Sequence, residues 1–96
     1  MCGAPDQDAT LAGVADTETV IQGRVVRDGA PAASAYVRLL DGSGEFTAEV
    51  PTGASGGFRF FAAPGTWTLR ALAPGAQAEQ AVAADRGVTD VTLELA

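Results

Sequence analysis

From residue 19 onward, hydrophobic and polar residues alternate with a period of two, the pattern of strands that bury one face. Clusters of Gly, Pro, Asp and Ser separate the alternating runs roughly every 8–12 residues, where turns are expected. No run shows the 3.6-residue period of an amphipathic helix. The pattern predicts seven strands, over residues 19–27, 34–40, 46–50, 58–61, 66–72, 77–83 and 88–95.

Seven short strands with this alternation are typical of an antiparallel β-sandwich, in which the inner faces of two sheets pack into one core. In the last predicted strand, for example, Val91, Leu93 and Leu95 alternate with Thr92 and Glu94. Applied to every strand, the alternation predicts a core made of Ile21, Val25, Val37, Leu39, Phe58, Phe60, Trp67, Leu69, Val91, Leu93 and Leu95.

Residues 1–18 differ from the rest of the chain. They mix Gly, Ala, Asp and Thr, sustain no hydrophobic period, and contain only Leu11 and Val14 as sizeable apolar groups. Four acidic residues and no basic residue give this segment a charge of −4. We therefore predict a flexible acidic N-terminal tail over residues 1–18 and one β-sandwich domain over residues 19–96.

Charge and composition narrow the classes of partner. The net charge of −6 argues against nucleic acid and anionic membranes, which both attract a positive surface. No apolar run approaches the ~18 residues of a membrane span, and no secretory signal precedes the domain. A single cysteine cannot form an internal disulfide, so we expect a cytoplasmic protein.

Cys2 is the only cysteine, and the chain has no histidine and no lysine. The usual general bases and Schiff-base amines are therefore missing, and side-chain nucleophilic chemistry points first to this thiol. If Met1 is removed, the new α-ammonium group lies beside the thiol and favours the thiolate, the form that attacks a persulfide. One hypothesis is a sulfur acceptor on a swinging arm. The alternative is an incidental cysteine in a terminal segment.

A metal at the N-terminus is the weaker interpretation of Cys2. An amine, a thiolate and backbone amides could hold a soft or square-planar ion. No histidine or second cysteine supports such a site, so a partner or a second copy would have to complete it. We expect no metal, no cofactor and no enzymatic activity.

Three arginines, Arg38, Arg59 and Arg70, fall on outward positions of the predicted strands. If their strands share a sheet, they could form a patch for an anion such as thiosulfate or for an acidic partner. The alternative is a solvated face on which the arginines pair with acidic neighbours at little gain in stability. The acidic residues that could form these pairs are Glu45, Glu49 and Glu94.

The same outward positions include four sizeable apolar residues. Such a group on a surface indicates a protein contact, a homodimer face, or a patch that the tail or a loop covers. The four residues are Tyr36, Leu40, Phe61 and Leu72.

Several segments resemble the carboxypeptidase-regulatory-like, transthyretin-like sandwich family. The resemblance lies in a glycine before an aromatic strand, Gly57-Phe58-Arg59-Phe60, and in Pro64-Gly65 before Trp67. Residues 21–25 and 31–39 also match. The resemblance implies the fold and little about activity. The related hydroxyisourate hydrolases rely on histidines, which this chain lacks.

A closer resemblance covers nearly the whole chain and rests on residues 1–5, 45–50 and 58–72. These segments resemble a small actinobacterial family of unknown function, called SseC-like, whose members are typically encoded beside a rhodanese-type thiosulfate sulfurtransferase. The resemblance implies a place in sulfur metabolism and that enzyme as a partner. It does not supply a mechanism.

Overall fold

The structure, a computed structural model, describes residues 18–95 of the chain. These residues form strands joined by turns and contain no helix. The strands are β1 (Thr19–Arg27), β2 (Ala30–Pro31), β3 (Tyr36–Leu40), β4 (Phe46–Pro51), β5 (Gly57–Ala62), β6 (Gly65–Ala73), β7 (Ala76–Ala84) and β8 (Gly87–Leu95).

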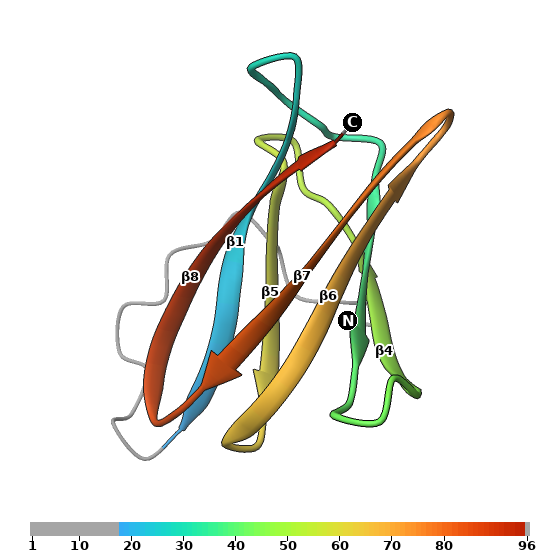
Figure 1. Cartoon of the computed structure of the whole chain (residues 1–96). Helices are drawn as coiled ribbons and strands as arrows, with labels where there is room; N and C mark the ends of the chain where they lie inside the picture. The colour runs from blue at the N-terminus through green and yellow to red at the C-terminus, as the bar shows by residue number, and fades with distance from the viewer. Residues whose placement is uncertain (1–17, 96) are drawn as a thin grey trace, which may run out of the picture.

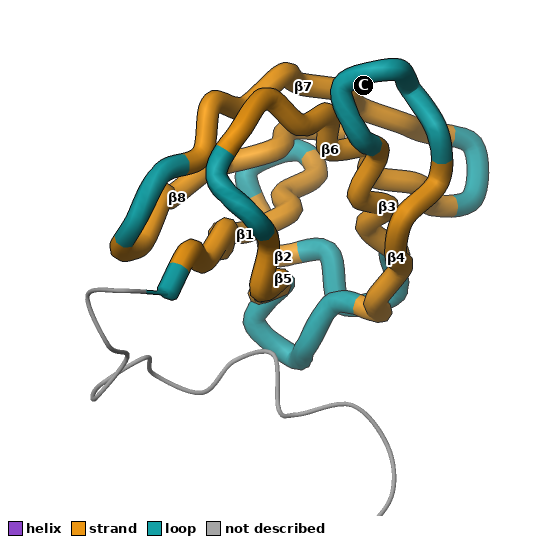
Figure 2. Tube along the Cα trace, turned by 90° about the horizontal axis from the view of Figure 1, so that it is seen from below, coloured by secondary structure: helices purple, strands orange, loops and turns teal. Residues whose placement is uncertain are grey.

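The strands form two four-stranded sheets that lie in separate layers (Figures 1 and 2). In sheet A, β1 pairs with β2, β5 and β8, and in sheet B the order is β4-β3-β6-β7. The chain passes between the sheets four times, at β2–β3, β4–β5, β5–β6 and β7–β8. The prediction of an all-β, two-sheet architecture is confirmed.

The number of strands differs from the prediction, because β2 is an additional strand of two residues. It pairs with the end of β1 through Val26 opposite Pro31 and Arg27 opposite Ala30. Proline has no N–H to donate, so this strand cannot extend into a longer ladder. The Asp28-Gly29 turn between β1 and β2 places both residues at positive φ, 53° and 80°. This conformation suits a two-residue hairpin turn.

The first and last strands of the domain run parallel, whereas an antiparallel sandwich was predicted. All nine residues of β1 pair with β8, from Thr19 opposite Gly87 to Arg27 opposite Leu95. On its other side β1 pairs antiparallel with β5. Parallel strands need a long connection, and here six intervening strands provide it.

The core lies between the sheets and matches the predicted alternation, except at one residue. Ten of the eleven predicted residues belong to the buried cluster, and Trp67 is only partly buried against it. The indole Nε1 of Trp67 donates a hydrogen bond to the Ala63 carbonyl (2.8 Å), which holds the ring near the end of the sheet. A polar tip of this kind favours the boundary of a core over its centre. The cluster also contains Ala35, Ala71, Val82 and Ala84.

Gly23, at the centre of β1, has no side chain to separate it from the backbone of β8. A Cβ atom added there would lie 1.6 Å from the carbonyl oxygen of Val91, its partner in β8. That contact is with backbone, so no side-chain rotation relieves it. Gly23 therefore permits the parallel ladder to pass through this point.

Thr52 fixes the loop that follows β2 against the end of β4. Its buried hydroxyl donates to the Ala32 carbonyl (2.6 Å) and accepts from the Ala35 amide (3.2 Å). The backbone amide of Thr52 also donates to the Ala35 carbonyl (2.9 Å). A buried hydroxyl satisfied in this way orders the crossover between the two sheets.

Asp41 organises the β3–β4 turn. Its carboxylate accepts hydrogen bonds from the Ser43 hydroxyl (2.7 Å), the Ser43 amide (2.9 Å) and the Glu45 amide (3.0 Å). The Ser43 hydroxyl, followed by the amides of Glu45 and Ser43, holds the pKa of Asp41 below its ordinary value. The charged form of the carboxyl is therefore the form that the turn stabilises.

We expect the substitution Gly23→Ala to destabilise the domain by about 3 kcal/mol or more, because the new methyl group must displace the β8 backbone. Urea denaturation monitored by tryptophan fluorescence measures this. Gly42→Ala is the matched control, since its Cβ would meet only the Thr66 carbonyl at 3.6 Å. If Gly23→Ala and Gly42→Ala unfolded at the same urea concentration, the backbones of β1 and β8 would not lie this close together at Gly23.

We expect the stabilisation from Asp41 to be present at neutral pH and lost in acid. Its pKa is lowered by folding, so its contribution is complete above the unfolded-state pKa and fades as the pH falls below about 4. A carboxyl-detected NMR titration measures the pKa directly. In Ser43→Ala, which removes the strongest donor, the Asp41 pKa should rise toward its ordinary value. If the pKa of Asp41 were the same in Ser43→Ala as in the native protein, the hydrogen bonds from Ser43 would not be the cause of the lowered pKa.

Candidate functional site

Cys2, the predicted sulfur acceptor, lies outside the described residues, as does the predicted tail through residue 17. The structure does show where that segment joins the domain. The carbonyl of Glu18 accepts a hydrogen bond from the Gly87 amide (2.7 Å), and β1 begins at the next residue. The segment therefore enters at the end of sheet A where β1 and β8 both begin.

Arg38 and Arg70 lie side by side on the outer face of sheet B, at paired positions of β3 and β6. Arg38 forms an ion pair with Glu49 of β4, and Arg70 forms one with Glu79 of β7, both at 2.7 Å. The four side chains form a row across the sheet with the charge order −, +, +, −. We call it the charged row. Glu49 was among the predicted partners, whereas Glu79 was not.

Arg59 does not join these two arginines, because β5 belongs to sheet A. It lies opposite Gln22 of β1 on the outer face of that sheet. The structure therefore does not form the patch of three arginines that the sequence allowed. Alternation along a strand gives the face of each side chain, but it does not tell which sheet the strand joins.

The four apolar residues predicted to point outward have different environments. Tyr36 is exposed and lies opposite the half-buried Leu72 on the outer face of sheet B. Leu40 is only 6% exposed, so its predicted exposure is wrong. Leu40 pairs with Phe46 across a β-bulge, and it is buried outside the core cluster. Phe46 itself is 61% exposed and was not predicted, although it begins a predicted strand.

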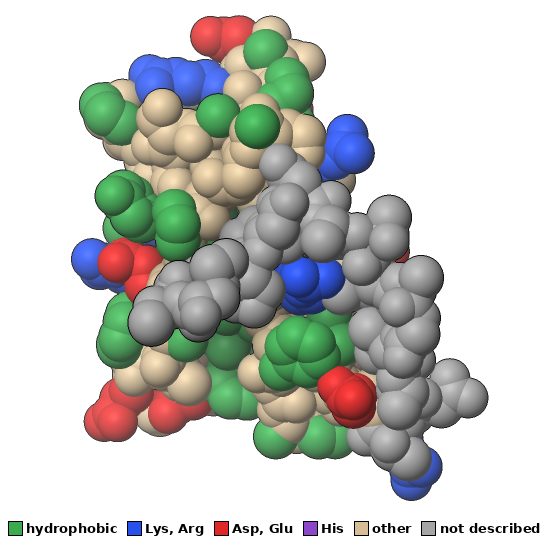
Figure 3. Space-filling view, turned by 180° about the vertical axis from the view of Figure 1, so that it is seen from behind, with side chains coloured by type: hydrophobic (Ala, Val, Ile, Leu, Met, Phe, Trp, Pro, Cys, Tyr) green, Lys and Arg blue, Asp and Glu red, His purple; other side chains and the backbone are tan. Residues whose placement is uncertain are grey.

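Phe61 lies on the outer face of sheet A in a row with two valines. Val20 of β1 is paired with Phe61 on one side and with Val88 of β8 on the other. We call these three residues the apolar row. Neither valine was predicted as a site residue, although both occupy outward positions of predicted strands. From behind, the molecule shows hydrophobic side chains beside both arginines and acidic residues (Figure 3).

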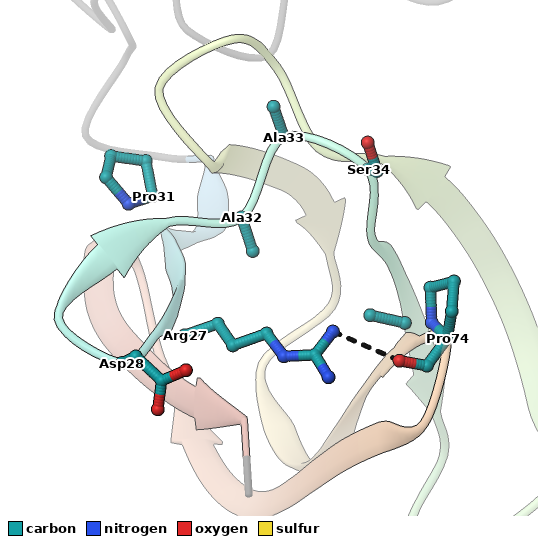
Figure 4. Close-up of a pocket in the computed structure, with 8 residues that line it drawn as sticks. Arg27, Asp28, Pro31, Ala32, Ala33, Ser34 and Pro74 are labelled. Atoms are coloured by element: carbon teal, nitrogen blue, oxygen red, sulfur yellow. Dashed lines mark hydrogen bonds between the residues drawn. The ribbon is translucent and has the colours of Figure 1, made fainter.

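A shallow depression of about 300 Å³ lies at one end of the sandwich, between the β1–β2 turn, the loop after β2 and the β6–β7 turn (Figure 4). The Arg27 side chain reaches across it, and Nη1 donates a hydrogen bond to the Pro74 carbonyl (3.0 Å). This bond connects a turn of sheet A to a turn of sheet B. The depression was not predicted, because it joins residues 27–34 to residues 73–74, which are distant in sequence.

Among residues 18–95, no three or more acidic, cysteine or histidine side chains gather closely enough to hold a metal ion. The same residues include no helix of the length and hydropathy needed to cross a membrane.

The described residues thus define an all-β, two-sheet sandwich domain with no evident catalytic constellation among them. The family described as "Protein of unknown function (DUF1416)" matches residues 2–95, and the chain belongs to that family. Two uncharacterised proteins of Mycobacterium tuberculosis, Rv0814c and Rv3118, are each 61% identical over 75 residues, which is 75% of this chain and of theirs. An uncharacterised protein of Mycolicibacterium smegmatis is 53% identical over 83 residues, covering 84% of this chain and 92% of its own.

Two solved structures share the fold. A DUF3823 family protein from Parabacteroides merdae superposes with a TM-score of 0.62 at 20% identity, over 81% of this chain and 45% of that one. A 3-chlorocatechol 1,2-dioxygenase from Rhodococcus opacus gives a TM-score of 0.57 at 14% identity, over 99% of this chain and 67% of that one. At these identities the likeness concerns the fold alone.

The charged row allows a prediction about the stability of the domain. In Glu79→Gln, Arg70 loses its carboxylate partner but still lies opposite Arg38. Like charges directly opposite each other destabilise a sheet. We expect this variant to lose up to about 1 kcal/mol of unfolding free energy at low salt, and the double variant Arg70→Gln/Glu79→Gln to recover most of it. Urea denaturation at low salt and at 1 M salt measures both. A double variant as unstable as Glu79→Gln would show that Arg38 and Arg70 do not repel each other.

Proposed function

We propose that this protein is a non-catalytic accessory of sulfur metabolism that accepts or carries sulfane sulfur on Cys2 for a rhodanese-type sulfurtransferase. The resemblance to the SseC-like and transthyretin-like families is part of this proposal. So is the cytoplasmic location, a reducing compartment in which a thiol stays available.

The observation that carries the proposal is the position of Cys2. It is the only cysteine in a chain without histidine or lysine, so it is the side chain best suited to nucleophilic sulfur chemistry. The DUF1416 family match begins at residue 2, so Cys2 falls within the length that the family shares. The segment that contains it is thus part of the family's common architecture.

The length of the N-terminal segment supports a carrier role. Fifteen residues separate Cys2 from Glu18, and an extended chain of that length spans at most about 50 Å. The longest dimension of the molecule is 37 Å. The thiol therefore has enough chain to enter a recessed site on a partner while the sandwich remains outside it.

The transfer balances without a separate oxidant or reductant. The enzyme's cysteine carries the sulfane sulfur as a persulfide. The Cys2 thiolate attacks the outer sulfur of that persulfide, a new S–S bond forms on Cys2, and the enzyme's S–S bond breaks. The enzyme's cysteine leaves as a thiolate, and Cys2 becomes the persulfide.

A second candidate function is a protein-binding module that needs no thiol. It is favoured by the large apolar side chains that the structure leaves exposed, Phe61 on sheet A and Tyr36 and Phe46 on sheet B. Groups of this kind on a small domain indicate contact surfaces. A homodimer would also use such a surface.

We expect the protein to gain the mass of one sulfur atom when it is mixed with a rhodanese-type sulfurtransferase and thiosulfate. Intact mass spectrometry detects the gain, and a reducing agent should remove it. Cys2→Ser is the control and should gain nothing. No gain on the native protein, while a small thiol in the same mixture is persulfurated, would refute the carrier role. Full complementation in cells by Cys2→Ser would favour the binding module.

A further inference from the structure

Strand β7 forms one edge of sheet B and is the starting observation. It pairs with β6 over all nine of its residues without a bulge, and among the described residues no second strand pairs with it. The next strand, β8, joins β7 through a turn, but the two strands separate away from that turn and form no ladder (Figure 1). An edge strand presents unpaired N–H and C=O groups that can pair with another chain.

The other edge strands in the described part of the chain carry features that discourage such pairing. β2 has two residues and contains Pro31, and β4 has a bulge and ends in Pro51. β5 spans six residues, and β8 carries the exposed carboxylates of Asp90 and Glu94. β7 is nine residues long, with no proline and with Glu79 as its one charged residue. It is therefore the long edge that lacks these protections.

We propose that β7 is the site at which two copies of this chain pair, antiparallel, about a two-fold axis at Gln80. The occupant of the edge is thus a second copy of the chain, and two four-stranded sheets join into one sheet of eight strands. The proposal concerns assembly, and it does not require Cys2 to accept sulfur.

The sequence of β7 is self-complementary in this arrangement. Gln80 lies opposite the partner's Gln80, and Ala76 lies opposite the partner's Ala84, so every residue of the strand is paired. Side chains that face the core also meet each other, as when Ala78 lies opposite the partner's Val82. A slip of one residue would instead place core-facing side chains opposite outward ones.

Gln80 and Glu79 fit this register. Gln80 shares the inner face of the sheet with the buried Val82 but is itself exposed. At the axis its amide group can both donate to and accept from the amide group of the partner's Gln80. Glu79 lies opposite the partner's Ala81 and is already neutralised by Arg70 at 2.7 Å. An axis at Glu79 would place two carboxylates directly opposite each other, which destabilises a sheet.

Sedimentation equilibrium of the full chain tests the proposal. We expect a reversible dimer that is populated at about 100 μM. Ala81 is exposed, so it can be replaced without disturbing the core. In Ala81→Glu, each new carboxylate lies opposite the partner's Glu79, and the dimer Kd should rise by about fivefold or more at low salt. In Ala81→Lys, an ammonium group lies opposite the same carboxylate, and the Kd should fall by about the same factor.

Thr47→Glu is the matched control. It adds the same charge at an exposed residue of β4, the edge strand on the other side of sheet B. Because that charge lies far from the axis, it should change the Kd by less than about twofold. In 1 M salt the differences among the variants should shrink, since dissolved ions screen the charges.

A disulfide gives a second readout that does not depend on charge. In Cys2→Ser/Gln80→Cys, the two introduced cysteines lie opposite each other at the axis. Directly opposed residues of antiparallel strands have Cα atoms about 4.5–5.5 Å apart, a separation that a disulfide bridges. Mild oxidation should therefore give a covalent dimer on non-reducing electrophoresis. Cys2→Ser/Thr47→Cys is the control and should cross-link much more slowly.

Four outcomes would overturn the proposal. The first is a chain that stays monomeric up to about 1 mM. The second is an equal change in Kd for Ala81→Glu and Thr47→Glu, and the third is a change in the same direction for Ala81→Glu and Ala81→Lys. The fourth is cross-linking of the Gln80→Cys chain that is no faster than that of the Thr47→Cys chain.

Hydrogen exchange distinguishes the reasons for the first outcome. A monomer in which every β7 amide is protected would identify another segment of this chain as the occupant of the edge, whereas rapid exchange at alternate amides would show an open edge. Either result would overturn pairing between copies. Persulfide transfer is measured by mass on Cys2, so the two proposals can fail separately.

Discussion

The parallel ladder between β1 and β8 is the constraint on which the other features depend. It pairs the first strand of the domain with the last and makes β1 the centre of sheet A, with β5 on its other side. This pairing carries Val91, Leu93 and Leu95 into the core opposite sheet B. It depends in turn on Gly23, where the backbone of β8 occupies the space that any side chain would need.

The same ladder creates the outer surface of sheet A. Phe61, Val20 and Val88 come from strands that are far apart in sequence, and only their pairing with β1 aligns them. The outer face of sheet B follows another principle, because its cations are matched by carboxylates in the same row. The outer face of sheet A thus carries the apolar row, whereas the outer face of sheet B carries the charged row.

The proposed accessory function rests on a division of roles in the molecule. The sandwich supplies a stable body and two distinct faces, while the only thiol lies sixteen residues before the described domain begins. Catalysis depends on a preorganised shell of side chains around the reacting group, and the described residues 18–95 include no thiol. A partner that already carries an activated sulfur would provide the missing environment. The proposed function is therefore sulfur transfer between two proteins, not a reaction run by this chain alone.

The amino-acid sequence by itself determined the fold class, the strand positions and nearly all of the core, because period-two alternation and turn residues are local signals. It also determined that Cys2 is the candidate nucleophile, since composition leaves little else. Only the tertiary structure decided which strands share a sheet, and so separated Arg59 from Arg38 and Arg70 and aligned Phe61 with Val20 and Val88. It also decided that Leu40 is buried beside a bulge and that β1 and β8 are parallel. The physical reason is that strand pairing joins residues more than sixty positions apart, and no local pattern encodes which distant backbone will approach a glycine such as Gly23.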